Sequence, residues 1–220
     1  MRILNGNETL NELYFLKAIG YKFINTSFSN FKKISNFDSI YELNKQIKEC
    51  SLCALKKTTK HSLVGSGNTN AKIMFITLSP SASEDESGEF LQGNLGLKLR
   101  ELIFNALNLE KDEFYISSIL RCKSLADNSK NLECFNLCKP YIIDEIRLIN
   151  PHVIVALGEQ VFLNLYPQNS MSMNFESIRG SILKFRDSFL LPTYSNSWLM
   201  KNPSFESIFL DDLRKIKGLI

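Results

Sequence analysis

Five cysteines are the residues of this chain whose spacing first suggests chemistry. Cys50 and Cys53 form a Cys-x-x-Cys pair, and Cys122, Cys134 and Cys138 follow far downstream. A close pair joined by two distant thiols could supply the four thiolates that an iron–sulfur cluster needs. Disulfides are not expected, because we see no secretory leader and thiols stay reduced inside cells. Cysteines scattered through a core would give the same spacing, so the pattern leaves both interpretations open.

The stretch from Ala71 to Gly96 is the second chemical candidate. It opens with an apolar run over 73–76 that predicts a buried strand, breaks at Ser79-Pro80-Ser81, and continues into an acidic loop that bears glycines. A helix is predicted over 95–107. A polar loop at the carboxyl end of a strand is the usual place for a ligand site in α/β proteins. An ordinary strand–helix connection would fit the same pattern.

The other segments alternate between strand and helix patterns, which predicts an α/β fold. We expect three αβα layers around a mostly parallel sheet of four to five strands. Further strands are predicted over 114–120 and 153–157, with edge strands over 182–185 and 189–191. Helices are predicted over 41–53, from Cys138 to Ile149, and over 159–166 and 204–217.

We expect the chain to be divided into two parts. Residues 1–45 form a helical N-terminal extension that either packs on the rest or docks a protein partner, and residues 46–220 form the main domain. No apolar run reaches the length of a membrane span, so we expect a cytoplasmic protein. Separately, we expect it to be a monomer. The net charge of +3 permits a nucleic-acid partner without requiring one.

Taken together, these segments resemble the uracil-DNA glycosylase superfamily, specifically its iron–sulfur branches, families four and five. The resemblance covers roughly residues 46–216 and leaves the extension unexplained. It rests on motifs in the family's order: Cys50–Cys53, Val64–Asn68, Glu84-Asp85 with Gly88, Gly93 and Gly96, Tyr115–Cys122, Cys138–Ile142, Val153–Gly158, Arg179-Gly180 and Pro192–Tyr194.

The resemblance implies a structural [4Fe–4S] cluster on Cys50, Cys53, Cys122 and Cys138, with Cys134 as the spare thiol. It also implies base excision from DNA. An enzyme of this type flips a deaminated or damaged base out of the stack and hydrolyses its N-glycosidic bond. No feature of the sequence separates a structural cluster from a redox-sensing one.

The chain departs from the family at the positions that act on the base. Leu78 stands where family four has a Glu that acts on water. Family five also has Leu there and uses a later carboxylate, whose position is Asn94 here. The stacking Phe is replaced by Leu91, the base-reading Asn by Ser118, and the His that donates to the base by Ser195.

One hypothesis is a divergent glycosylase with an altered pocket. Asn94 and Asp85 are its candidate catalytic residues, since either side chain can orient water. Asp85 also fits a role in capping or bracing the loop, and we favour that role over the catalytic one. The predicted base pocket comprises Leu78, Ser79, Leu91, Ser118 and Ser195.

The alternative is a catalytically inactive iron–sulfur protein that binds DNA or nucleotides, or a scaffold in DNA repair or recombination. In either case Lys56, Lys57 and Lys60 are predicted to bind phosphates. Trp198 and Lys201 lie in the loop that enters the minor groove in the family. Trp198 would wedge or stack there, unless it is a core residue.

Overall fold

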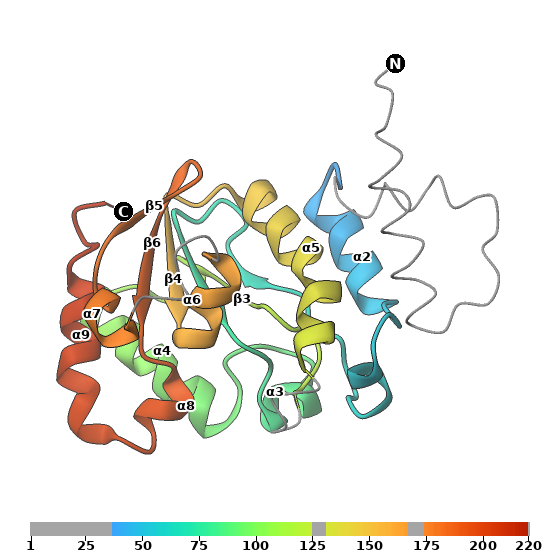
Figure 1. Ribbon diagram of the computed structural model, residues 1–220, viewed down its shortest axis with the longest axis horizontal. Helices are drawn as coiled ribbons and strands as arrows, with labels where there is room; N and C mark the ends of the chain where they lie inside the picture. The colour runs from blue at the N-terminus through green and yellow to red at the C-terminus, as the bar shows by residue number, and fades with distance from the viewer. Residues whose placement is uncertain (1–36, 125–130, 167–173, 220) are drawn as a thin grey trace. The chain divides into compact units, whose positions relative to one another are not determined.

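A six-stranded sheet lies at the centre of the computed structural model (Figure 1), which describes residues 37–124, 131–166 and 174–219. The strand order is β1-β3-β2-β4-β6-β5. The four inner strands are parallel, and both edge strands are antiparallel to their neighbours. The strands are β1 (Ser66–Gly67), β2 (Ile73–Thr77), β3 (Tyr115–Ser118), β4 (Val153–Leu157), β5 (Leu183–Phe185) and β6 (Ser188–Thr193).

The predicted mostly parallel sheet is confirmed, with two corrections. The count of four to five strands is too low, because the two-residue β1 adds an edge to β3. The segment 189–191 was predicted to be an edge strand, but β6 pairs with β4 on one side and β5 on the other. Its side chains are mostly buried, as expected of an inner strand.

Helices cover both faces of the sheet, so the three-layer αβα arrangement is confirmed. Met74 and Ile76 of β2 face the layer formed by α5 (Asn131–Ile149) and α6 (Glu159–Leu165). Ile73 and Phe75 face the opposite layer, formed by α4 (Gly93–Leu107) and α9 (Glu206–Arg214). This alternation is the two-residue period of a strand buried on both faces. Shorter elements complete these layers: α7 (Phe175–Ile178), α8 (Asn196–Leu199) and the 3₁₀ turn η5 (Pro203–Phe205).

Helix α2 (Ile40–Lys48) packs on α5 and buries Leu43 and Ile47. It crosses the boundary expected at residue 45, and it ends before the Cys-x-x-Cys pair rather than at Cys53. The 3₁₀ turn η2 (Ala54–Lys57) follows that pair. Residues 1–36 lie outside the described residues, so the predicted extension stays a prediction. No helix in the described ranges is long and apolar enough to cross a membrane.

The acidic loop contains a short helix, α3 (Ala82–Ser87), that the hydrophobic pattern did not predict. Ser81 and Glu84 form a reciprocal capping box at its start, and Gly88 ends it with a φ of 78°. The sequence signal was present, because Ser-x-x-Glu is the capping-box pattern. Helix α3 has only six residues, which is too short to show a helical period of apolar residues.

A buried charge pair fastens α5 to the end of β3. The Arg121 guanidinium lies 2.7 Å from the Glu145 carboxylate, and the two side chains are 1% and 0% exposed. The other donors to Glu145 are the hydroxyls of Tyr115, at 3.0 Å, and Ser117, at 2.6 Å. Paired in this way, neither charge is left isolated in the low-dielectric interior.

Replacement of Glu145 by Ala should therefore be strongly destabilising. The change leaves the Arg121 charge buried and unpaired, so we expect a loss of about 3–5 kcal/mol in the free energy of unfolding, measured by urea denaturation. The matched control is Glu101→Ala on the exposed side of α4, for which we expect less than about 1 kcal/mol. A similar small loss for both variants would contradict this role of the pair.

Candidate functional site

A hollow of about 300 Å³, which we call the edge pocket, opens at the carboxyl edge of the sheet. Three segments at the ends of parallel strands line it: residues 77–81 from the last residue of β2, residues 157–161 from the last residue of β4, and residues 195–197 after β6. Glu84 and Leu95 complete the wall. The site predicted after β2 is therefore built from three strand ends, as expected where parallel strands share an edge.

Three of the predicted base-pocket residues line the edge pocket, namely Leu78, Ser79 and Ser195. Ser195 also starts α8, because its hydroxyl accepts a hydrogen bond from the Trp198 backbone N–H at 3.3 Å. Its hydroxyl lies 3.2 Å from that of Ser197. The residue at the family's His position is thus at the pocket wall and carries a hydroxyl.

The other two predicted pocket residues are not in the described lining. Ser118 is fully buried and donates its hydroxyl proton to the Leu120 carbonyl at 2.6 Å. Leu91 is also buried and has a φ of 65°, a conformation that is strained for a leucine. Its backbone N–H donates to the Glu84 carboxylate at 2.9 Å. A side chain at Gly96 would collide with the Leu91 backbone, so the loop is held tightly here.

The two predicted catalytic residues lie apart from the described pocket lining. Asn94 is exposed in the first turn of α4. Asp85 is buried on α3 and binds the segment after η2, accepting hydrogen bonds from the Thr59 hydroxyl and from the backbone N–H groups of Lys60 and His61. It also forms an ion pair with Lys123 at 3.1 Å. The bracing role of Asp85 therefore accounts for its contacts.

Sequence reasoning missed the polar groups that follow β4. Glu159 and Gln160 open α6 and line the edge pocket. Glu84 also lines it, but its two carboxylate oxygens accept backbone N–H groups, from Ser81 at 2.8 Å and from Leu91. Glu159 is exposed and has no hydrogen bond or ion pair with any described residue. A signal was available, because Gly158 ends β4 and polar residues follow it. We had considered a ligand site only at the end of β2.

The five thiols gather between α2, the end of β3 and α5. Burial raises the pKa of Cys122, and the nearby Cys53 and Cys50 raise it further. Burial raises the pKa of Cys138 to about 12, and the nearby Cys53 and Cys50 add to the increase. The hydrogen bond from the Arg121 backbone N–H acts in the opposite direction. Burial and a contact with Cys53 also raise the pKa of Cys134 to about 12. All five thiols thus lie near one another, although in the part of the chain that the structure describes no three His, Cys, Asp or Glu side chains are placed to hold one metal ion.

The predicted phosphate-binding lysines have different surroundings. Lys56 is half-buried and donates to the Ser62 hydroxyl at 3.0 Å, which itself lies 3.5 Å from the Cys122 sulfur. Lys60 forms an ion pair with Glu86. Lys57 is exposed and has no ion pair within the described ranges. Of the three lysines, Lys57 is the one left to bind a phosphate without breaking another contact.

Trp198 is half-buried in an aromatic cluster rather than extended from the surface. Its ring stacks on Tyr194, with centroids 4.3 Å apart, and contacts the edge of Phe205 at 5.0 Å. Lys201 is exposed nearby. Between them, Met200 is 46% exposed, which is unusual for a large apolar side chain. Sequence reasoning did not single out Met200.

Comparison with known proteins identifies the family of this chain. Residues 64–214 match the family described as the uracil DNA glycosylase superfamily. The chain belongs to this superfamily. It is 28% identical over 189 residues to the type-4 uracil-DNA glycosylase of Saccharolobus solfataricus, covering 84% of this chain and 86% of that one. It is also 28% identical over 181 residues to the type-4 uracil-DNA glycosylase of Thermotoga maritima, covering 81% and 93%. The edge pocket lies within the matched residues.

Asp85 gives a pH-dependent test of its bracing role. Burial raises its pKa, but the hydrogen bonds from Thr59, His61, Lys123 and Lys60 outweigh this and lower it from 3.8 to about 2. A carboxyl whose folded-state pKa is lowered stabilises the fold above its unfolded pKa and loses this effect as the pH falls. Asp85→Asn should cost about 2 kcal/mol of unfolding free energy at pH 7, and the difference should shrink between pH 4 and pH 2.

The control for this experiment is Glu86→Gln, which removes an exposed ion pair and should change the free energy of unfolding by less than about 1 kcal/mol. A loss for Asp85→Asn that stays constant down to pH 2 would show that the carboxylate charge is not what braces the loop.

Proposed function

We propose that the chain is a divergent DNA glycosylase that hydrolyses the N-glycosidic bond of a deaminated or damaged base held in the edge pocket. The observation that carries the proposal is that this pocket stays open, with polar side chains in a partly apolar wall, in a chain of this superfamily. Leu78 does not fill it, and hydroxyl, amide and carboxylate groups line it. Its volume of about 300 Å³ is at the lower end for small-ligand sites, as a single base requires.

In this proposal the pocket residues divide the chemical work. The departing base needs a hydrogen-bond donor for its developing negative charge, and Ser195, Asn196 and Ser197 carry donors at the wall. The water needs a base or an orienting group, and the Glu159 carboxylate is available for it. Asn94 is exposed next to Leu95 of the pocket wall and remains a second candidate for orienting water.

DNA binding would use the exposed residues around the same edge. Lys57 and Lys201 are exposed cations that can neutralise phosphates. Met200 follows α8, whose first residues line the edge pocket, and an exposed apolar side chain can enter between base steps and support a flipped base. In this proposal Met200, rather than Trp198, inserts between base steps, because the Trp198 ring is stacked on Tyr194.

The second candidate function is a non-catalytic DNA- or nucleotide-binding protein or scaffold. One observation favours it: the β2 segment has Leu78 at the pocket and no free carboxylate, since Glu84 is bound to backbone groups. Loss of one charge-stabilising group commonly lowers a rate by about a hundred- to a thousandfold. A protein partner bound through residues 1–45 would belong to this candidate.

A [4Fe–4S] cluster on Cys50, Cys53, Cys122 and Cys138 is part of the proposal. Among the described residues, no three His, Cys, Asp or Glu side chains are placed to hold one metal ion. In the cube each thiolate binds a different iron atom, so its ligands stand farther apart than those of a single ion. An all-thiol donor set gathered from three elements fits such a cluster. When bound, it would cross-link these elements; redox sensing remains the alternative role.

The test of the glycosylase is excision from end-labelled oligonucleotides that contain uracil, hypoxanthine or xanthine, as single strands and duplexes. We expect release of at least one of these bases, and a rate at least about a hundredfold lower for Glu159→Gln. Asn94→Ala is measured in the same excision assay. Glu101→Gln, on the exposed side of α4, is the matched control and should leave the excision rate unchanged. No release of any base, with tight salt-dependent binding of the same oligonucleotides, would favour the binding protein.

The cluster is tested on protein purified without oxygen. We expect about four iron atoms per chain and broad visible absorbance, both lost when Cys50, Cys53, Cys122 or Cys138 is changed to Ser. Cys134→Ser is the matched control, because it removes a buried thiol on the same helix and should retain the iron. Iron that is lost in Cys134→Ser but kept in Cys138→Ser would reverse the ligand assignment.

A further inference from the structure

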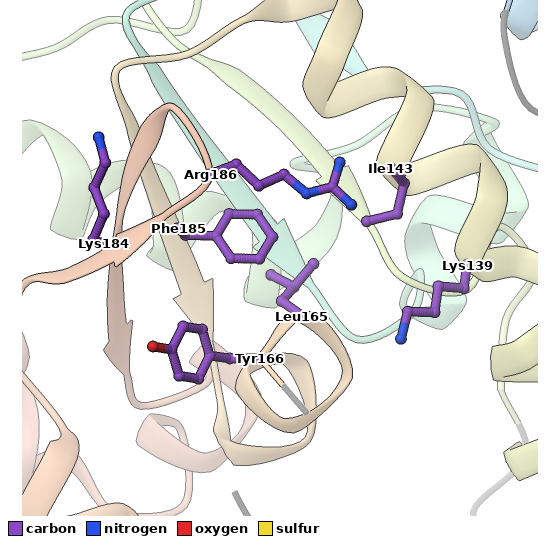
Figure 2. Close-up of a pocket in the computed structure, with 7 residues that line it drawn as sticks. All are labelled: Lys139, Ile143, Leu165, Tyr166, Lys184, Phe185 and Arg186. Atoms are coloured by element: carbon purple, nitrogen blue, oxygen red, sulfur yellow. The ribbon is translucent and has the colours of Figure 1, made fainter. Parts of the chain in front are cut away.

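A second hollow, which we call the hairpin pocket, lies on the face of the sheet covered by α5 and α6 (Figure 2). It has a volume of about 430 Å³ and is lined from α5, from the end of α6 and from the β5–β6 hairpin. The hairpin turn precedes β6, whereas the edge pocket follows β6. The two hollows therefore lie at opposite ends of the same strand.

Two cations border an apolar floor in the hairpin pocket. Figure 2 shows Arg186 extending from the hairpin toward Ile143 on α5, and Lys139 extending from α5 toward α6. Leu165 and Phe185 form the floor between them. Lys184 also borders the pocket, but its side chain points away and its amine lies 5.1 Å from the centre of the Phe189 ring.

Neither cation is neutralised by the described part of the protein. None of the described residues that line the hairpin pocket carries a carboxylate, and neither Arg186 nor Lys139 forms an ion pair with any described residue. The described contact of Arg186 is with a ring, since its guanidinium carbon lies 5.7 Å from the centre of Phe185. The guanidinium edge, which binds phosphate through paired N–H groups, is thus available to a ligand.

The backbone conformation of Arg186 is a second observation, independent of the pocket lining, that bears on the role of this residue. Its φ is 52° at the first central position of the tight turn between Phe185 and Ser188. Glycine is the usual residue where a two-residue hairpin has a positive φ at this position. An arginine there carries a conformational cost that glycine would avoid, so folding of the turn does not account for the arginine. A role for its side chain does.

We propose that the hairpin pocket binds a nucleoside phosphate, with the phosphate between Arg186 and Lys139 and the base against Tyr166 and the apolar floor. Two unpaired cations match the phosphate charge, and aromatic and aliphatic side chains match the flat apolar base. The nucleotide is either free or part of a single DNA strand, and both present the same chemistry.

The test is calorimetric titration of the full chain with thymidine 5′-monophosphate, and with thymidine as the probe that lacks the charge. We expect the nucleotide to bind at least tenfold more tightly than the nucleoside. Arg186→Gly and Lys139→Ala should each remove at least tenfold of the nucleotide affinity. Arg186→Gly is the informative variant, because glycine suits the turn and the protein should melt no lower than the original.

Lys217→Ala, an exposed lysine in the C-terminal segment, is the matched control and should bind as the original does. Base excision and iron content should stay unchanged in Arg186→Gly, which separates this site from the edge pocket and from the cysteines. Equal affinity for nucleotide and nucleoside would overturn the proposal. So would nucleotide binding that survives both Arg186→Gly and Lys139→Ala.

A ten-residue thymidine oligonucleotide then distinguishes the two sources. If the site serves a single strand, changing both Arg186 and Lys139 lowers the affinity for the oligonucleotide at least tenfold. The slope of log affinity against log salt should then fall by about 0.7 when both cations are removed, since each neutralised phosphate of a single strand contributes about 0.7 and the two cations bind one phosphate. If the site serves a free nucleotide, changing both Arg186 and Lys139 leaves the oligonucleotide affinity and its salt slope unchanged, because Lys57 and Lys201 still bind the strand.

Discussion

The buried pair of Arg121 and Glu145 is the interaction on which the placement of the other parts depends. Arg121 follows β3, and Glu145 lies on α5, so their contact fixes the helix against the strand end. Cys122 is the next residue after Arg121, and Cys138 lies on the same helix as Glu145. The backbone N–H of Arg121 also reaches the Cys138 thiol. One ion pair thereby sets the separation of two predicted cluster ligands.

The site separates residues that hold the loop from residues that face the ligand. Glu84 and Asp85 use their carboxylates to bind backbone N–H groups, and Gly96 allows close approach to Leu91. These residues keep the shape of the wall. Leu78 and Ser195 face the hollow. The motif residues that persist are those that the loop needs for its shape, which explains how the pocket chemistry differs while the fold does not.

Much of this arrangement was predictable from the sequence, and the failures have physical causes. Strand runs such as 73–76 and 153–157 are strong signals, because strands buried on both faces are apolar at every position. Spacing alone left the cysteines undecided, and the resemblance supplied their assignment. Composition could not show whether Trp198 was packed or projecting, or that Lys60 was paired, because these depend on neighbours distant in sequence. Glu159 was missed because a single exposed carboxylate at a helix start has no periodic signature.

The short edge strands affect how the native sheet meets other chains. β1 has two residues, and a side chain at its Gly67 would collide with the Phe114 carbonyl. β5 has three residues, with a charged Lys184 at its centre. A long, flat and apolar edge is what allows a sheet to grow by adding strands from another molecule, and short or charged edges prevent it. Growth of this sheet by strand addition would therefore have to begin by the opening of an edge, so resistance to such growth depends on the stability of two of the smallest described elements.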